Sequence, residues 1–195
     1  MTETRHRPQD SQKTARKSTR LEGFDYSSEG SYFITLVTKN RIHLFGEIVD
    51  EEMVLNEFGR IVEFTWNDLL NHNTDMGFGE FCIMPNHVHG IIHLYGKKEI
   101  STVGVGSEPT PVFHQAGLEP ASTRSSQTLS EIVRQFKTFS ARRINALRET
   151  VGVSVWQRSF YDHIIGIDRE YSQIEEYILD NPREWAWDEE NREID

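Results

Sequence analysis

The first candidates for chemistry are two histidines, His87 and His89, in the segment 84–94 (MPNHVHGIIHL). The segment reads as a strand, and alternate residues of a strand share one face. Two imidazoles on one face can bind a single divalent cation together, if a third ligand comes from elsewhere. The same spacing also fits two exposed histidines on a sheet, so both interpretations stay open at this point.

The other residues of this segment have separate expected roles. The apolar residues of opposite parity are predicted to face the core: Val88, Ile92 and Leu94. Gly90 leaves room for a close approach by a ligand or by backbone. His93 shares the parity of His89 but lies roughly 13 Å from it along an extended strand, so we predict a surface or packing role. A histidine-triad nucleotide hydrolase would need a third histidine where Ile91 stands.

A second candidate pair, Tyr177 and Asn181, is separated by one helical turn and therefore shares a helix face. A tyrosine hydroxyl, with an ordinary pKa near 10, becomes a useful nucleophile when a cation stabilises the phosphate that it attacks. Asn181 offers a neutral oxygen, which is an acceptable third ligand for a hard cation such as Mg²⁺. The structural alternative places Tyr177 beside an apolar helix face and Asn181 at the helix C-terminus.

These residues need a scaffold, which the apolar periodicity outlines. It predicts strands over 31–38, 81–84 and 87–95, with short extended pieces at 154–157 and 161–165. It predicts helices over 56–70, 129–148 and 169–180, and a loop over 71–79. Asn56, Thr128 and Asp168 are the expected N-caps, and Glu131 completes a capping box with Thr128. This order predicts an α+β fold of ferredoxin-like type, with helices packed on one face of an antiparallel sheet.

Composition divides the chain into parts. We predict a basic disordered arm (1–22), a single domain (23–187) that contains a flexible insertion (98–127), and an acidic tail (188–195). The chain has a net charge of −10, but six basic and two acidic residues stand among its first 20. A basic arm on an acidic body is typical of a nucleic-acid-binding tail, and equally of a solvated terminus.

Several classes of protein are excluded. One cysteine rules out an intrachain disulfide framework and a multi-cysteine metal site. The apolar runs are far shorter than the roughly 18 residues that a membrane span requires. The polar N-terminus lacks the apolar core of a signal peptide, so a cytoplasmic protein without membrane contact is expected.

Three segments together resemble the REP-associated tyrosine transposases, which belong to the single-tyrosine HUH transposase superfamily. They are 85–90 (PNHVHG), 155–163 (VWQRSFYDH) and 177–182 (YILDNP). In this superfamily two histidines flank a bulky apolar residue, here Val88. The resemblance extends from about Arg20 to Trp187, and the insertion matches nothing in it. It implies an HUH motif on a central strand, cleavage and rejoining of single-stranded DNA, and recognition of DNA hairpins.

The resemblance also implies a role for each candidate residue. His87 and His89 would hold Mg²⁺ or Mn²⁺, with Asn181 as the third ligand. Tyr177 would attack the scissile phosphate, leaving a 5′-phosphotyrosine link and a free 3′-OH. Tyr161, which lies near His163 in the second segment, is the alternative nucleophile.

DNA contacts are expected from basic residues of the arm, of the helix 129–148 and of the second segment. They are Arg16, Lys17, Arg20, Arg134, Lys137, Arg142, Arg143 and Arg158. The expected partner is single-stranded or hairpin DNA, the expected location is the nucleoid within the cytoplasm, and the expected state is a monomer or a homodimer. Two alternatives remain: a non-catalytic hairpin-binding protein of the same ancestry, and a phosphoesterase acting on small nucleotides.

Overall fold

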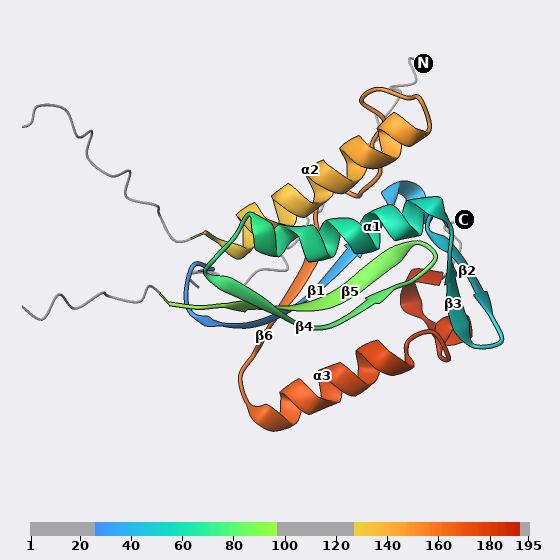
Figure 1. Ribbon diagram of the computed structural model, residues 1–195. Helices are drawn as coiled ribbons and strands as arrows, with labels where there is room; N and C mark the ends of the chain where they lie inside the picture. The colour runs from blue at the N-terminus through green and yellow to red at the C-terminus, as the bar shows by residue number, and fades with distance from the viewer. Residues whose placement is uncertain (1–25, 97–126, 192–195) are drawn as a thin grey trace, which may run out of the picture.

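A four-stranded antiparallel sheet carries the histidine pair in the computed structural model, which describes residues 26–96 and 127–191 (Figure 1). Its strands are β1 (Gly30–Val37), β4 (Met76–Ile83), β5 (His87–Leu94) and β6 (Tyr161–Ile165). They are ordered β4-β5-β1-β6, so β5 is a central strand. Helix α1 (Glu57–Asp68) connects β1 to β4 by way of a short hairpin, and helix α2 (Leu129–Leu147) lies between β5 and β6. The predicted ferredoxin-like α+β fold is therefore confirmed.

The two faces of the sheet are covered by different helices. In Figure 1, α1 and α2 lie on one side of the sheet, and α3 (Asp168–Asp180) lies on the other. The prediction that all helices share one face was therefore wrong. The reason is a second apolar cluster, formed by Phe33, Ile91 and Ile178, which buries the inner face of α3 against the sheet.

The main core lies between the sheet and the α1–α2 layer, as the parity of β5 predicted. Val88 is fully buried there, together with Trp66 from α1 and Phe136 from α2. Gly90 faces this core, where a Cβ atom would come within 2.7 Å of the Trp66 ring. The close neighbour of Gly90 is therefore an aromatic side chain rather than a ligand or backbone.

The helix starts follow the predicted chemistry in two cases of three. Asn56 accepts hydrogen bonds from the backbone N–H groups of Phe58 and Gly59, and Thr128 forms the capping box with Glu131. Asp168 does not cap α3, because it is already the first helical residue and Ile167 occupies the N-cap.

One hairpin was not predicted, and one strand begins earlier than predicted. Strands β2 (Gly46–Val49) and β3 (Glu52–Leu55) are joined by Asp50 and Glu51, both with positive φ. Such a two-residue turn is usually marked by glycine, which is absent here. The predicted loop 71–79 was also wrong at its end, because β4 begins at Met76 and Phe78 stacks on Trp66. Within the described ranges, no helix has the length and apolar character needed to cross a membrane.

Candidate active site

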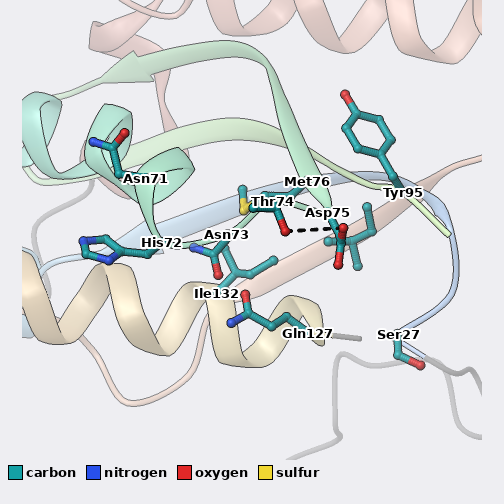
Figure 2. A pocket seen from close by; sticks show the side chains of 11 residues that line it. Ser27, Asn71, His72, Asn73, Thr74, Asp75, Met76, Tyr95, Gln127 and Ile132 are labelled. Carbon is teal, nitrogen blue, oxygen red and sulfur yellow. Dashed lines mark hydrogen bonds between the residues drawn. The ribbon is translucent and has the colours of Figure 1, made fainter. Parts of the chain in front are cut away.

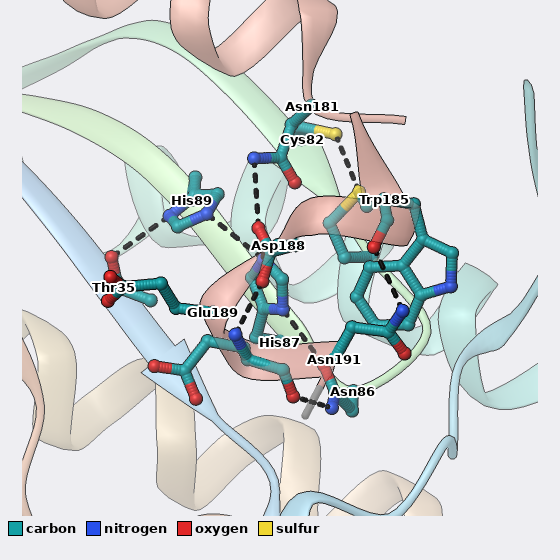
Figure 3. A network of polar contacts seen from close by, with 12 residues as sticks. Thr35, Cys82, Asn86, His87, His89, Asn181, Trp185, Asp188, Glu189 and Asn191 are labelled. Atoms are coloured by element: carbon teal, nitrogen blue, oxygen red, sulfur yellow. Dashed lines mark hydrogen bonds and ion pairs between the residues drawn. The ribbon is translucent and has the colours of Figure 1, made fainter. Parts of the chain in front are cut away.

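The two histidines lie at the start of β5, on the face that α3 covers. Both are buried, with exposed fractions of 0% for His87 and 3% for His89. Their Nε2 atoms converge at 3.0 Å (Figure 3). Two ligand atoms that bind one octahedral cation at ~2.1 Å and at right angles are also about 3 Å apart, so the pair has the spacing of two adjacent ligands.

Neighbouring side chains orient both rings. The His87 Nδ1 atom lies 2.8 Å from Asn86 Oδ1, and the Asn86 Nδ2 group donates to the backbone carbonyls of Glu190 (2.7 Å) and Arg41 (3.3 Å). Because Asn86 Oδ1 can only accept, His87 donates from Nδ1 and directs the lone pair of Nε2 into the site. The Thr35 hydroxyl, which can donate or accept, contacts His89 Nδ1 at 2.9 Å and restrains the second ring.

Burial also keeps both rings neutral. Desolvation lowers the pKa of His87 to about 3, and it lowers the pKa of His89 well below the ordinary 6.5. The neutral imidazole is the form that binds a metal ion. At pH 7 both histidines are therefore in the ligand form.

Two further side chains with oxygen atoms lie near the histidines: Asn181 at the end of α3, and Asp188 after it. Asn181, at the C-cap of α3, is buried and donates from Nδ2 to Asp188 Oδ2 at 3.3 Å, whereas its own Oδ1 is buried without a partner. Asp188 Oδ2 lies 4.0 Å from His87 Nε2, with its side chain 5% exposed. His87, His89 and Asp188 present ligand atoms that all lie within 4.8 Å of one another. Two imidazole nitrogens together with an amide oxygen and a carboxylate form a ligand set that suits a divalent cation.

Asp188 is a site residue that no sequence pattern pointed to. It stands seven residues after Asn181, with no helical or strand spacing to link them, and it lies in the segment predicted as an acidic tail, 188–195. The sequence signal that could have indicated Asp188 is the nearby Trp185. Its ring packs against His43 and His87, so the chain after α3 lies beside the site. An aromatic anchor after a helix stop indicates that the chain packs back onto the domain.

The two candidate tyrosines face one cleft of about 680 Å³, which is also lined by His89 and Asp188. The Tyr177 hydroxyl lies 3.3 Å from His89 Nε2, and its ring lies edge-on to Phe33. Tyr161, on β6, contacts the same Phe33 ring from another side, with centroids 6.2 Å apart. Burial raises the pKa of Tyr177 to about 12, and the Asp188 carboxylate adds to this rise.

The candidate DNA-binding residues fall into separate places. Arg134, Lys137 and Arg158 line a second cleft of about 350 Å³ beside α2. There the Lys137 ammonium donates to the carbonyls of residues 158 (3.3 Å) and 159 (3.2 Å), and burial lowers its pKa to about 8. Arg143 instead forms an ion pair with Asp68 at 2.6 Å, and Arg142 is exposed.

Some predictions lie outside the described residues. These are the N-terminal arm with Arg16, Lys17 and Arg20, and all of the insertion except its last residue. The two clefts, by contrast, are continuous in their lining, because Gln157 and Phe160 border both.

Comparison with known proteins gives a relative and a shared fold. No family model matches the chain. It is 38% identical over 177 residues to an uncharacterized protein of Haemophilus influenzae, covering 89% of this chain and 92% of the other. The chain belongs to the family of that protein. A REP-associated tyrosine transposase, solved bound to a REP hairpin, matches with a TM-score of 0.52 at 16% identity, over 87% of this chain and 76% of the other. That likeness shows a transposase-like fold.

Proposed function

We propose that this protein is a metal-dependent single-stranded DNA transposase, which cleaves and rejoins DNA at hairpin-containing repeats through a 5′-phosphotyrosine intermediate. The observation that carries the proposal is the convergence of three reactive atoms. The Nε2 atoms of His87 and His89 are 3.0 Å apart, and the Tyr177 hydroxyl is 3.3 Å from His89 Nε2. A potential nucleophile beside two neutral imidazoles is what metal-assisted phosphoryl transfer requires.

The residues present fit a divalent cation. His87 and His89 would hold Mg²⁺ or Mn²⁺, and the third ligand would be Asn181 Oδ1 or the Asp188 carboxylate. The unpartnered Asn181 Oδ1 supports this fit, because leaving a buried amide oxygen without a donor or cation costs about 1–3 kcal/mol. The cation, when bound, would polarise the scissile phosphate and offset the negative charge of the cleft.

Tyr177 would then act as the nucleophile. Its hydroxyl oxygen would form a bond to phosphorus while the bond from phosphorus to the 3′ oxygen breaks. The tyrosine loses a proton, the 3′ oxygen gains one, and the protein stays attached to the 5′ phosphate. Because one phosphodiester replaces another, attack by a 3′-OH on this link rejoins strands without ATP.

The electrostatics of the cleft are unfavourable both to ionisation of Tyr177 and to a bound phosphate, which supports a role for a cation. Burial and Asp188 raise the pKa of Tyr177 to about 12, so its hydroxyl is protonated at pH 7. Asp188, Glu189 and Glu190 also line the cleft, where their charges would repel a phosphate. His87 and His89 would offset both effects by holding a cation beside the Tyr177 hydroxyl.

The DNA strand would leave this cleft past Gln157 and Phe160, which also border the basic cleft beside α2. Arg134, Lys137 and Arg158 would contact its phosphates there. The REP hairpin bound by the structurally similar transposase supports hairpin DNA as the partner.

A non-catalytic hairpin-binding protein is the second candidate, and the acidic lining of the cleft is the observation that favours it. A phosphoesterase for small nucleotides is less suited, since it has no use for Tyr177 or for a basic cleft.

A denaturing gel, a native gel and a nucleotide-hydrolysis assay together separate these functions. The substrate is a hairpin oligonucleotide labelled at its 3′ end, incubated with the protein and Mn²⁺ or with EDTA. A transposase gives a metal-dependent labelled protein–DNA adduct, and a 5′-labelled copy gives a shorter free fragment. A gel shift under native conditions without an adduct would favour the binding protein. Neither signal, together with hydrolysis of a nucleotide substrate, would favour the phosphoesterase.

A further inference from the structure

A cavity of about 360 Å³ lies at the far end of the sheet from the histidines, and the proposed function does not use it. It is lined by the loop that precedes β4, by the end of β5 at Leu94 and by the start of α2 (Figure 2). His87 begins β5 and Leu94 ends it, so roughly 23 Å of strand separates the cavity from the candidate active site. Its volume falls within the range of small-molecule pockets, about 300–1,000 Å³.

Two amide oxygens face this cavity without a donor. They are Oδ1 of Asn73, a residue only 5% exposed, and Oε1 of Gln127. The Asn73 Nδ2 group donates to the Leu69 carbonyl at 2.7 Å and to Gln135 Oε1 at 3.3 Å, which fixes Oδ1 as the atom that points inward. Figure 2 shows the two oxygens pointing toward one another beside Ile132. A buried amide oxygen without a donor destabilises the fold, so a donor between the two oxygens would be stabilising.

The other residues that line the cavity favour a donor with a positive charge. Asp75 contributes a carboxylate, and the Thr74 hydroxyl already donates to it at 3.5 Å. No lysine or arginine is among the described residues that line the cavity. The one basic ring, His72, lies 3.7 Å from Asp68. The two buried polar atoms without a partner are acceptors, and the charged lysines and arginines that would attract a phosphate or carboxylate are absent from the described lining. Together with the exposed Asp75 carboxylate, this favours a cation that carries N–H donors.

We propose that this cavity binds a small primary ammonium compound. Its N–H groups would bridge Asn73 Oδ1 and Gln127 Oε1, and Asp75 would supply the counter-charge. A primary ammonium has three donors and no acceptor, which matches this lining. Its alkyl chain would lie against the apolar wall formed by Met76 and Ile132.

Calorimetric titration of the full chain at pH 7 tests the proposal, with butane-1,4-diamine as the probe. Tetramethylammonium has a positive charge without N–H donors, and deoxycytidine has a neutral amine, so neither is expected to bind. Gln127→Met removes Oε1 and keeps the side-chain length, and it should weaken diamine binding at least about tenfold, or about 1.4 kcal/mol. Gln173→Met is the matched control, because Gln173 is exposed on α3.

Each other outcome overturns the proposal. Absence of diamine binding up to millimolar concentration would mean that the cavity holds only water. Equal binding of tetramethylammonium would mean that charge alone is recognised, and binding of deoxycytidine would make the cavity a nucleobase site. Equal effects of both glutamine variants would place the diamine elsewhere on the acidic surface. None of these measurements requires DNA, so they are independent of the proposed transposase activity.

Discussion

Asp188→Asn should weaken Mn²⁺ binding strongly, because it removes a buried charge beside the histidines and keeps the shape of the side chain. Asp188 Oδ2 lies 4.0 Å from His87 Nε2, and the side chain is 5% exposed. A divalent cation about 4 Å from a carboxylate gains about 2 kcal/mol in water and about 8 kcal/mol at an effective dielectric constant of 20. Dehydration of both ions offsets much of the larger value. The lower value corresponds to a loss of affinity of about thirtyfold, which we take as the minimum.

Asn181→Ala provides the comparison, because it removes a neutral oxygen from the same site. We expect a loss of about tenfold, the value of one hydrogen bond or neutral ligand in a buried site. Asp180→Asn is the matched control. Asp180 is an acid at the end of the same helix, but it is half exposed and pairs with Arg183 at 3.0 Å.

Calorimetric titration with Mn²⁺ at pH 7 measures all four proteins, and thermal melts verify that each variant is folded. Affinity of the Asp188→Asn variant within about threefold of the unmodified protein would refute a role for this carboxylate at the metal. A folded, unmodified protein that binds no Mn²⁺ would refute the metal site itself.

Three further predictions concern the nucleophile, the histidines and the DNA path. Tyr177→Phe should abolish the covalent adduct with hairpin DNA. It should lower the free energy of unfolding by only about 1 kcal/mol, since one hydrogen bond is lost. Tyr161→Phe should retain activity, and the reverse pattern in the adduct assay would transfer the role to Tyr161. Folding lowers the pKa of His87 from 6.5 to about 3, so below pH 6.5 the unfolded chain binds a proton that the folded chain does not. In EDTA, the free energy of unfolding should therefore fall below pH 6.5 by up to about 1.4 kcal/mol per pH unit. Urea unfolding at pH 7 and pH 5 measures this change, and an equal midpoint at both would contradict it. Replacing Arg134 and Arg158 with glutamine should lower the salt slope of single-strand binding by roughly 0.7 for each lost phosphate contact; an unchanged slope would place the DNA elsewhere.

The scaffold could be predicted from the sequence because local chemistry determines it. Asn56 and the pair Thr128–Glu131 set the starts of two helices through their own side chains, without help from the rest of the fold. The parity of β5 separates core-facing from site-facing residues in the same local way. Local sequence could not predict the position of α3, because the apolar residues on its inner face would fit against either face of the sheet. The cluster of Phe33, Ile91 and Ile178, which joins three separate elements, holds it over the histidines.

The same distinction explains which parts of the candidate site were visible. His87 and His89 are neighbours in one strand, and Tyr177 and Asn181 are neighbours in one helix, so spacing alone pairs them.

Asp188 reaches the site by a different route. Arg41 contacts the two residues that follow Asp188. Its guanidinium donates to the Glu189 carbonyl at 2.7 Å and forms an ion pair with the Glu190 carboxylate at 3.2 Å. Asn86, which orients His87, donates to the Glu190 carbonyl as well. The group that sets the tautomer of a histidine therefore also positions the acidic segment beside it. Loss of Asn86 should consequently disturb both the ring and the carboxylate.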